Sequence, residues 1–371
     1  MENNFKENRI VLFLPTLLGG GAEETFVHLA RYLASKNLKV YLIIGTKKTS
    51  NIYSFEENEN ISLIELNSDR LMFSFRSLHK TLKQIQPQKI FSTLWYANIL
   101  IYPIAKNLKI PLVVREAGLD YRHENNFKSK LITQIIKYTY SRCDSIIAIS
   151  NSMKDNLVNV VGIPSKKIHT IFNPVESYID RNSLSKVNFE RYFNDISQNT
   201  KYAVSACRLD KVKGLELLVN SFSYIKDLDI KLLIIGEGAE KDHLKNLIVS
   251  LGLEEKIKII PWQKNIYDFI FSCDYYLSAS INEGLGNAYL ASHLLNKQNL
   301  CSNIPASLEL NALFNKGVAF ELNEIDISNK IRSVYSLNQT SSKVDINTIK
   351  KFTFQRCFES YLNLTNKKIR S

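Results

Sequence analysis

Short, nearly uninterrupted runs of valine, isoleucine and leucine recur along this chain and alternate with segments of helical spacing. Strands that are apolar on both faces are typical of parallel sheets covered by helices on each side. Two series of such runs occur, and their members lie at 9–15, 38–45, 89–95, 110–116 and 144–150, and then at 202–209, 230–236, 256–262 and 274–280. The pattern therefore predicts an α/β protein with two doubly wound, Rossmann-like domains.

The length of the chain and a change in its composition indicate where the domains divide. At 371 residues the chain exceeds what one hydrophobic core usually organises. Between the two series the periodicity is lost and residues 176–200 are polar, so we expect a linker there. We expect an N-terminal domain at 1–175, a C-terminal domain at 201–344, and a terminal helix at 345–371 that can return to the first domain.

Composition limits the class of protein. The five cysteines are scattered singly and lack CxxC spacing, which argues against a disulfide framework or a zinc site and favours a reducing compartment. The first apolar run is too short for a signal peptide, and no window approaches the roughly 18 apolar residues of a membrane span. We therefore expect a cytoplasmic protein, or one that is peripheral to the inner face of a membrane.

Positive charge is concentrated in the first half of the chain. Residues 1–175 hold 23 Lys and Arg against 14 Asp and Glu, whereas residues 176–371 hold 25 against 22. A basic first domain favours an anionic partner such as a lipid surface or a phosphorylated substrate, and a lysine-rich solvated surface is the alternative. No dense Lys/Arg run with interleaved aromatic residues occurs, so we expect no binding to nucleic acid.

Glycines and cations gather where the apolar runs end, and this is the edge where parallel sheets bind ligands. Gly20 and Gly21 lie in the first such turn, TLLGGGAEETF, whose helix start favours an anion unless the glycines serve only a tight turn. Arg208 and Lys213 lie in the first turn of the second domain, ACRLDKVKGLELL. Two cations beside a helix start suit a diphosphate, and two solvent-facing cations are the alternative.

Two later turns of the second domain carry further candidates for ligand contact. Gly236 and Gly238 in GEGAEKDHL allow a ligand to approach the backbone closely. Trp262 and Gln263 follow another strand and can offer a nucleobase an aromatic face and backbone groups. A plain loop is an equally good interpretation of this last segment.

The stretch INEGLGNAYLASHLL places an acid and two glycines just before a helix. Glu283 lies in the loop, and the amides of Leu285, Gly286 and Asn287 lie near the helix start, where an anion is favoured. A carboxylate beside an anion-binding helix start suits a phosphorylated sugar, because the acid accepts from hydroxyls while the amides take the phosphate. A glutamate that merely caps the helix is the alternative.

Taken together, these loops resemble glycosyltransferase family 4, whose members are retaining enzymes of the GT-B fold. The resemblance covers nearly the whole chain, and it rests on GGGAEETFVHLARYLA, ACRLDKVKGLELLVNSF, GEGAEKDHLKNLI, IIPWQKNIYDFIFSCDYYLSASINEGLGNAYL and the terminal ESYL. STLWYANILIYPIA and VVREAGLDYR look like members that build bacterial surface polysaccharides such as capsule and O-antigen. The GT-B fold implies two Rossmann-like domains that face each other across a cleft, with the acceptor on the first.

The resemblance also implies roles for individual residues. Arg208 and Lys213 would neutralise the donor diphosphate, Glu283 would hold hydroxyls of the transferred sugar, and the amides of 285–287 would bind phosphate. The glycine-rich turn of the first domain would flank the donor phosphate and the acceptor. No metal or other cofactor is implied, because the cations replace it, and the leaving phosphate would take the proton of the acceptor.

The sequence departs from the family pattern at two places. Ala291 stands where the family has a second acid that accepts from the ribose hydroxyls, and whether Ser292, His293 or another loop replaces that acid stays open. Many members also place a histidine near the reacting sugar after the strand at 110–116. Here that strand ends at Glu116, with His123 some residues later, and we select Glu116 as a further catalytic candidate.

These features predict a retaining, metal-independent glycosyltransferase. It would move a sugar from a nucleotide-sugar, with UDP favoured over GDP, onto a lipid-linked glycan in bacterial surface polysaccharide synthesis, with an anionic membrane surface as partner. Ala291 motivates one alternative, a degenerate nucleotide-sugar-binding scaffold of the glycan assembly machinery, although one lost ribose hydrogen bond costs only about 1–3 kcal/mol. Another GT-B enzyme, such as a nucleotide-sugar 2-epimerase, would need a different set of histidines and acids, which we do not find.

Overall fold

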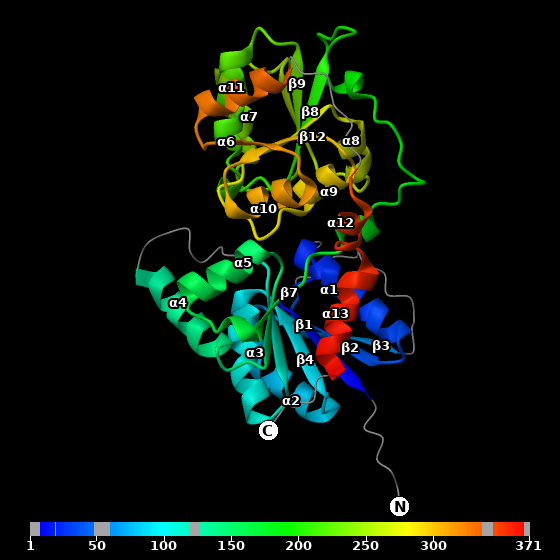
Figure 1. Ribbon diagram of the computed structural model, residues 1–371. Helices are drawn as coiled ribbons and strands as arrows, with labels where there is room; N and C mark the ends of the chain where they lie inside the picture. The colour runs from blue at the N-terminus through cyan, green and yellow to red at the C-terminus, as the bar shows by residue number, and fades with distance from the viewer. Residues whose placement is uncertain (1–7, 19, 48–59, 119–126, 336–343, 367–371) are drawn as a thin grey trace, which may run out of the picture. The chain divides into compact units, whose positions relative to one another are not determined.

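The computed structural model describes residues 8–18, 20–47, 60–118, 127–335 and 344–366 (Figure 1). The chain forms two compact units. Unit 1 comprises residues 1–174 and 353–371, and unit 2 comprises residues 175–352. The polar segment after residue 175 thus belongs to unit 2, where it carries two short 3₁₀ helices, η5 (Val175–Tyr178) and η6 (Phe189–Tyr192).

Unit 1 is built on a sheet that has seven parallel strands among the described residues, in the order β3-β2-β1-β4-β5-β6-β7. The strands are β1 (Arg9–Leu14), β2 (Lys39–Thr46), β3 (Ile61–Ser68), β4 (Lys89–Thr93), β5 (Leu112–Glu116), β6 (Ser145–Ala148) and β7 (Ile168–Thr170). The helices are α1 (Gly21–Ser35), α2 (Phe75–Ile85), α3 (Trp95–Asn107), α4 (Phe127–Tyr140), α5 (Asn151–Asn156) and α13 (Phe354–Asn366). The expected runs omit β3, which lies at the sheet edge, where its side chains alternate between partly buried and exposed.

Both faces of the unit 1 sheet are covered, as the continuous apolar runs predict. Val11 and Phe13 of β1 point into one apolar layer, whereas Ile10 and Leu12 point into the other. This alternation follows from the two-residue period of a strand, because successive side chains leave opposite faces. Such a strand is therefore apolar at most of its positions, as in Ile10 to Leu14 of β1.

The terminal helix is divided between the two units. The short α12 (Ile346–Lys350) belongs to unit 2, whereas α13 belongs to unit 1 and packs beside α1 (Figure 1). The ring of Tyr361 in α13 lies 5.7 Å from that of Phe91 in β4, and Lys89 donates a hydrogen bond to the backbone carbonyl of Leu364. The predicted return of the C-terminal helix to the first domain is confirmed.

Unit 2 is built on a second parallel sheet, with six strands among the described residues, in the order β10-β9-β8-β11-β12-β13. The strands are β8 (Lys201–Ala206), β9 (Ile230–Ile235), β10 (Ile257–Ile260), β11 (Tyr275–Ser278), β12 (Gln298–Ser302) and β13 (Val318–Phe320). The helices are α6 (Leu215–Ser221), α7 (Lys241–Ser250), α8 (Ile266–Ser272), α9 (Asn287–Leu294), α10 (Pro305–Phe314) and α11 (Glu324–Tyr335). Like unit 1, it is doubly wound.

The strand order of unit 2 creates a switch point. From β8 the chain proceeds outward to β9 and β10, and it then returns to place β11 on the other side of β8. The loops after β8 and β11 therefore leave the same edge of the sheet in opposite directions, an arrangement that in doubly wound sheets forms a crevice. Ligands of doubly wound sheets bind at this crevice, outside the carboxyl ends of the strands.

Candidate active site

A buried ion pair joins the two loops at the switch point of unit 2. Lys213 ends the 3₁₀ turn η7 (Lys211–Lys213) after β8, and Glu283 lies in the loop after β11. The Nζ atom of Lys213 lies 2.5 Å from Oε1 of Glu283, and the two side chains are only 14% and 18% exposed. Two residues that are 70 positions apart in the sequence thus meet where the fold predicts a ligand.

Hydrogen bonds from two side chains converge on Glu283. The Ser280 hydroxyl donates to Oε1 of Glu283 at 2.9 Å, beside the bond from Lys213. Burial alone would lower the pKa of Lys213, but the adjacent Glu283 carboxylate outweighs burial and raises it. Both bonds end on Oε1, and no described residue donates to Oε2, which leaves that oxygen for a further donor.

Gly214 allows the two loops to come together. It follows Lys213 with a left-handed φ of 59°, which is costly for residues that carry a Cβ atom. A Cβ atom at this position would lie 2.1 Å from the backbone oxygen of Ala279, at the end of β11. The close approach that this glycine permits sets the position of Lys213. Neither Gly214 nor Ser280 is among the expected site residues, although a glycine directly after the lysine and a serine three residues before the acid are visible in the sequence.

The predicted diphosphate cations occupy different environments. The Arg208 side chain is 72% exposed and pairs with Asp210 in its own loop, with Nη1 and Oδ2 3.2 Å apart. Lys213 is buried and paired across loops. Both follow the carboxyl end of β8, but only Lys213 is held in place by a second loop.

Gly236 and Gly238 are required by packing within the protein. A Cβ atom at Gly236 would lie 1.9 Å from the backbone oxygen of Cys207, and one at Gly238 would lie 2.4 Å from that of Leu209. The loop after β9 therefore packs directly against the loop that carries Arg208 and Lys213. This packing accounts for both glycines without a ligand, and their contact with a donor stays a prediction.

The loop of Glu283 leads into α9 through a glycine. Gly286 has a φ of 79° immediately before the first residue of α9, Asn287. The Leu285 side chain is buried, so this loop is anchored to the unit between the acid and the helix. The amides of 285–287 lie at the helix start, as the sequence predicts, and their role in phosphate binding stays a prediction.

The residues considered as substitutes for the missing acid point into the protein. Ala291 is fully buried, and the Ser292 hydroxyl donates to the Tyr289 carbonyl of its own helix at 2.7 Å. The ring of His293 stacks on that of Phe314 with centroids 4.9 Å apart. Burial lowers the pKa of His293 to about 3, against a smaller opposing effect of a nearby asparagine. Neither the Ser292 nor the His293 side chain therefore faces a ligand bound at the start of the helix.

The proposed nucleobase contact lies after the edge strand β10. Trp262 is 56% exposed, and Gln263 donates from its side-chain amide to the carbonyl of Pro261 at 3.0 Å. An exposed indole at a strand end offers a free aromatic face for stacking. The contact with a base stays a prediction.

In unit 1 the glycine-rich turn is closed by its own acid. The Glu23 carboxylate of α1 accepts from the backbone amides of Leu18 at 2.7 Å and Gly20 at 2.9 Å, and it also accepts from the hydroxyl of Thr16. Gly21 begins α1. The amide of Gly20 is therefore bound to a carboxylate of the protein, where the sequence predicts a phosphate.

Glu116, the further catalytic candidate, is enclosed within unit 1, and its role in catalysis stays a prediction. Glu116 is the last residue of β5 and is fully buried. Its carboxylate accepts from the Tyr140 hydroxyl at 2.7 Å and from the amides of Ala117 and Gly118. These bonds give Glu116 a structural role in anchoring the chain after β5. His123 lies outside the described residues.

A strained residue marks the switch point of unit 1, which lies between β1 and β4. Leu94, between β4 and α3, has a φ of 73° and a ψ of 126°, a conformation that bulky residues rarely adopt. Strain of this kind persists at positions that the surrounding structure fixes, and it often accompanies ligand sites. No signal in the sequence identifies this residue.

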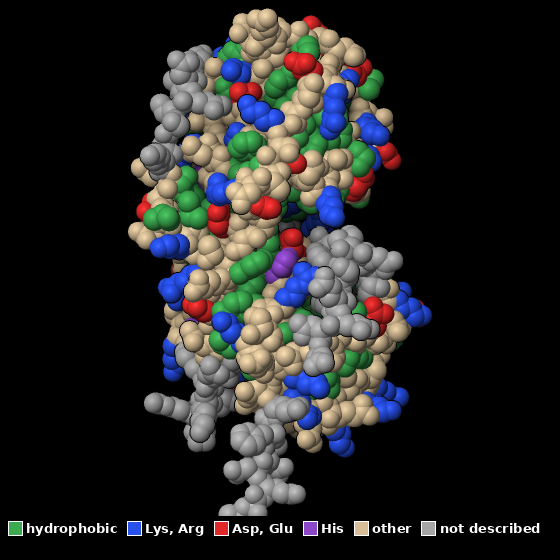
Figure 2. Space-filling view, turned by 90° about the vertical axis from the view of Figure 1, so that its right-hand side faces the viewer, with side chains coloured by type: hydrophobic (Ala, Val, Ile, Leu, Met, Phe, Trp, Pro, Cys, Tyr) green, Lys and Arg blue, Asp and Glu red, His purple; other side chains and the backbone are tan. Residues whose placement is uncertain are grey.

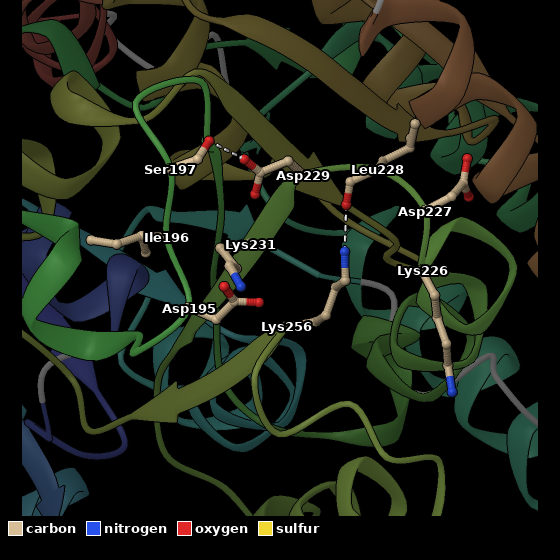
Figure 3. A pocket seen from close by; sticks show the side chains of 9 residues that line it. All are labelled: Asp195, Ile196, Ser197, Lys226, Asp227, Leu228, Asp229, Lys231 and Lys256. Atoms are coloured by element: carbon tan, nitrogen blue, oxygen red, sulfur yellow. Dashed lines mark hydrogen bonds between the residues drawn. The ribbon is translucent and has the colours of Figure 1, made fainter.

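A separate hollow of about 230 Å³ in unit 2 is a poor candidate for the active site (Figure 3). Its residues precede β8, β9 and β10 or, like Lys231, lie at the start of β9, so the hollow is at the edge opposite the carboxyl ends of the strands. Asp229 accepts from the hydroxyls of Ser197 and Thr200, while Lys231 and Lys256 donate to backbone carbonyls. Most of its charged groups are therefore already engaged within the unit.

The chain matches models of known families over both units. The model of Glycosyltransferase Family 4 matches residues 19–177, and the model of Glycosyl transferases group 1 matches residues 187–351. The two matches together span most of the chain and carry the loops described above.

Individual relatives are consistent with these matches. The chain is 29% identical over 296 residues to the N-acetylgalactosamine-N,N'-diacetylbacillosaminyl-diphospho-undecaprenol 4-alpha-N-acetylgalactosaminyltransferase of Campylobacter jejuni. This alignment covers 76% of this chain and 78% of the relative. It is 24% identical over 359 residues to the capsular polysaccharide biosynthesis glycosyltransferase CapH of Staphylococcus aureus. This alignment covers 93% of this chain and 96% of CapH.

Solved structures agree on the fold. HepE of Anabaena, in complex with UDP and glucose, aligns with a TM-score of 0.75 over 96% of this chain and 98% of its own at 15% identity. With its two doubly wound parallel sheets, the chain has the GT-B fold. The chain therefore combines a Glycosyltransferase Family 4 domain with a Glycosyl transferases group 1 domain, and it is a glycosyltransferase.

Proposed function

We propose that this enzyme transfers a sugar from a nucleotide-sugar, UDP-linked in preference to GDP-linked, onto a lipid-linked glycan of a bacterial surface polysaccharide. The observation that carries the proposal is the buried pair of Lys213 and Glu283 at the switch point of unit 2. The pair offers a cation for a diphosphate and a carboxylate oxygen for sugar hydroxyls within one crevice.

The proposed chemistry uses no metal and retains the configuration of the sugar. The bond between the anomeric carbon and the diphosphate breaks, and the acceptor oxygen attaches to the same face. The proton of the acceptor hydroxyl passes to the leaving phosphate. Lys213, with Arg208 and the amides of 285–287, stabilises the charge that develops on that phosphate, and such preorganised charge is usually the largest contribution of a protein.

Glu283 serves the sugar in this proposal. Its Oε1 atom is held by Lys213 and Ser280, so the carboxylate is fixed before the substrate arrives. Its Oε2 atom accepts from hydroxyls of the transferred sugar. A fixed carboxylate orients the anomeric carbon toward the acceptor without a reorganisation cost during the reaction.

Relatives support the choice of donor and acceptor. The name of the Campylobacter jejuni relative specifies an acceptor linked to undecaprenol through diphosphate, and the Anabaena structure holds UDP and glucose. An undecaprenol-linked acceptor would bring the enzyme to the inner face of the cell membrane. Among the described residues, no helix is long and apolar enough to cross a bilayer.

A donor and acceptor screen tests the proposal. Purified protein is incubated with UDP- and GDP-sugars and an undecaprenyl-diphosphate-linked glycan, with EDTA present, and nucleotide release and the anomeric configuration of the product are measured. We expect release of UDP with retention, and we expect Lys213→Gln to remove most of it. Release that requires a divalent metal, or that is unchanged in Lys213→Gln, would contradict the proposed chemistry.

A non-catalytic nucleotide-sugar-binding scaffold is the second candidate, and the buried Ala291 favours it. Such a scaffold would bind a nucleotide-sugar without turnover. Thermal shift with each donor separates the two, because a bound ligand raises the melting temperature whether or not it reacts. A donor that shifts the melting temperature but releases no nucleotide with any acceptor would favour the scaffold.

A further inference from the structure

The outer face of α4 in unit 1 exposes an apolar stripe. Phe127, Leu131, Ile135 and Tyr138 are between 38% and 82% exposed. Their spacing of four, four and three residues places them on one side of the helix. The opposite side of the helix, with Ile136 and Tyr140, is already buried in the core of the unit. The stripe, which we call the α4 face, is therefore a second apolar surface that the fold does not use.

Cations border the α4 face on both sides. At 100° per residue, Lys128 falls on one side of the stripe, and Lys130 and Lys137 fall on the other. The guanidinium of Arg142 stacks on Tyr138 at 3.8 Å from the ring centroid. Residues 127–142 and the facing residues 95–109 contain no Asp or Glu. By contrast, the side of unit 1 opposite α4 shows acidic and basic side chains together (Figure 2).

A shallow hollow of about 610 Å³ adjoins the stripe between α3 and α4. Tyr102 and Pro103 of α3 line it together with Ile135 and Tyr138, and Lys106 stands among them. The surface thus combines an apolar floor with cationic groups, an arrangement that fits acyl chains below anionic headgroups.

The position of α4 relates this surface to the sheet edge. Helices of a doubly wound sheet run antiparallel to its strands, so the N-terminal end of α4 lies nearest the carboxyl ends of the strands. Phe127, the first residue of α4 and the most exposed of the four, therefore lies toward the edge at which such sheets bind their ligands.

We propose that the α4 face seats unit 1 on an anionic lipid bilayer, with the apolar stripe in the interface and the surrounding cations at the headgroups. The inference deepens the proposed function and rests on it for the source of the membrane-bound acceptor. Charge favours lipid over a second copy of this chain, because a symmetric contact would set the cations of one α4 face against those of the other. Juxtamembrane Lys and Arg are instead attracted to anionic lipid.

Cosedimentation with vesicles tests the proposal without any nucleotide-sugar. The full chain is mixed with vesicles of phosphatidylcholine and phosphatidylglycerol, and with vesicles of phosphatidylcholine alone. We expect Phe127→Gln combined with Leu131→Gln to lower the partition coefficient about tenfold or more. We expect Lys128→Gln, Lys130→Gln and Lys137→Gln together to lower binding to the anionic vesicles and to weaken its dependence on salt.

A matched control keeps the interpretation specific. Val249 and Ile325 of unit 2 are 60% and 58% exposed, and Val249→Gln with Ile325→Gln should leave vesicle binding unchanged. Melting temperatures of all variants verify folding, and the replaced side chains are exposed enough to keep it. Analytical ultracentrifugation reports whether the apolar variant changes the oligomeric state.

The outcomes are decisive in each direction. Loss of anionic vesicle binding in both α4 variants, with the control intact, supports the proposal. A wild-type chain that does not bind anionic vesicles overturns it, as do α4 variants that bind as wild type does. A dimer that the apolar variant dissociates while vesicle binding persists would assign the α4 face to a second copy. Because no donor is present, failure of sugar transfer with normal α4-dependent binding would refute the proposed function alone.

Discussion

The glycine-containing loops of the two units use an acidic side chain in different ways. In unit 1 Glu23 turns back on its own loop, where it accepts from the amides of Leu18 and Gly20. In unit 2 Glu283 reaches across to Lys213, which belongs to a loop 70 residues earlier in the chain. Both acids lie near the carboxyl end of a strand at a switch point, and both are mostly buried.

The difference separates an acid that shapes a loop from an acid that is available for chemistry. Backbone amides and a neighbouring hydroxyl satisfy Glu23, and its carboxylate is part of the turn. The bonds that Glu283 receives come from side chains and fall on one of its two oxygens. A carboxylate that a cation from another loop holds through one oxygen keeps its second oxygen for a ligand. The lysine ammonium, which has three N–H donors, keeps two of them for a diphosphate. The comparison makes unequal predictions for the two acids.

The largest expected effect is on catalysis by unit 2. Glu283→Gln keeps the shape of the side chain but removes its charge, and we expect the rate of sugar transfer to fall about 10²–10³-fold. Without the carboxylate, burial is left to lower the pKa of Lys213, so the residual activity should decline at a lower alkaline pH than in the wild type. The pH profile of the transfer rate measures both effects.

A nearby acid provides the control for this variant. Glu237 lies in the loop after β9, is 51% exposed and pairs with Lys241 at 2.9 Å. Glu237→Gln should retain near wild-type turnover, because an exposed pair contributes little. Equal losses in the two variants would mean that the charge of the whole crevice matters more than the pair at the switch point.

The next largest effect concerns the glycine that joins the two loops. Gly214→Ala should destabilise unit 2 by more than about 3 kcal/mol, because it combines a left-handed φ with a 2.1 Å contact to the Ala279 oxygen. Gly252 offers a matched comparison in the same unit, since its φ is 61° and a Cβ atom there would meet nothing within 4 Å.

Gly252→Ala should cost only the backbone strain, about 1 kcal/mol. Urea denaturation of both variants in a Trp95→Phe background, followed by the fluorescence of Trp262 in unit 2, measures both costs. If the two alanines cost the same, the contact between the loops would relax easily, and Gly214 would not fix the position of Lys213.

The acid of unit 1 should affect local structure more than catalysis. Glu23→Ala leaves the amides of Leu18 and Gly20 and the hydroxyl of Thr16 without their acceptor, at about 1 kcal/mol for each. Hydrogen–deuterium exchange of peptides that span residues 16–22 should therefore accelerate at least about tenfold. The adjacent Glu24→Ala should leave exchange unchanged, because burial raises the pKa of Glu24 and its charge gives the fold no support. If exchange in Glu23→Ala stayed at the wild-type rate, the glycines and not Glu23 would account for the stability of the turn.

The sequence predicts much of this architecture because apolar runs report local burial. It predicts most of the buried strands, the loops at their ends and, as separate residues, the candidates Lys213 and Glu283, but it misses the buried strand β12. It does not predict that Lys213 and Glu283 pair, because the pairing depends on β11 lying beside β8, which is a property of strand order. It does not predict that Glu116 is buried, because whether the last residue of a strand faces the core depends on where pairing ends. It omits β3, because an edge strand buries only part of each face.

The smallest expected effect is a pH dependence that resides in the buried helix of unit 2. The pKa of His293 is lowered from an ordinary 6.5 to about 3 by burial. As the pH falls below 6.5, the unfolded chain binds a proton that the folded chain does not, so this histidine's contribution is fully present above pH 6.5 and is lost progressively toward pH 3. At pH 5 the loss amounts to about 2 kcal/mol. His293→Phe keeps an aromatic ring against Phe314 but cannot take up the proton.

Urea denaturation of unit 2 at pH 7 and pH 5 therefore tests whether solvent reaches His293 in α9. This helix also carries Ala291, at the position where the family has its ribose-binding acid. We expect His293→Phe to lose less stability than the wild type between the two pH values. His243→Phe provides the control, because the His243 side chain is half exposed on α7 and contributes little to packing. Parallel losses in the wild type and His293→Phe would mean that the imidazole is solvated and protonates freely in the folded enzyme. In that case His293 would again be available as the replacement for the missing ribose acid.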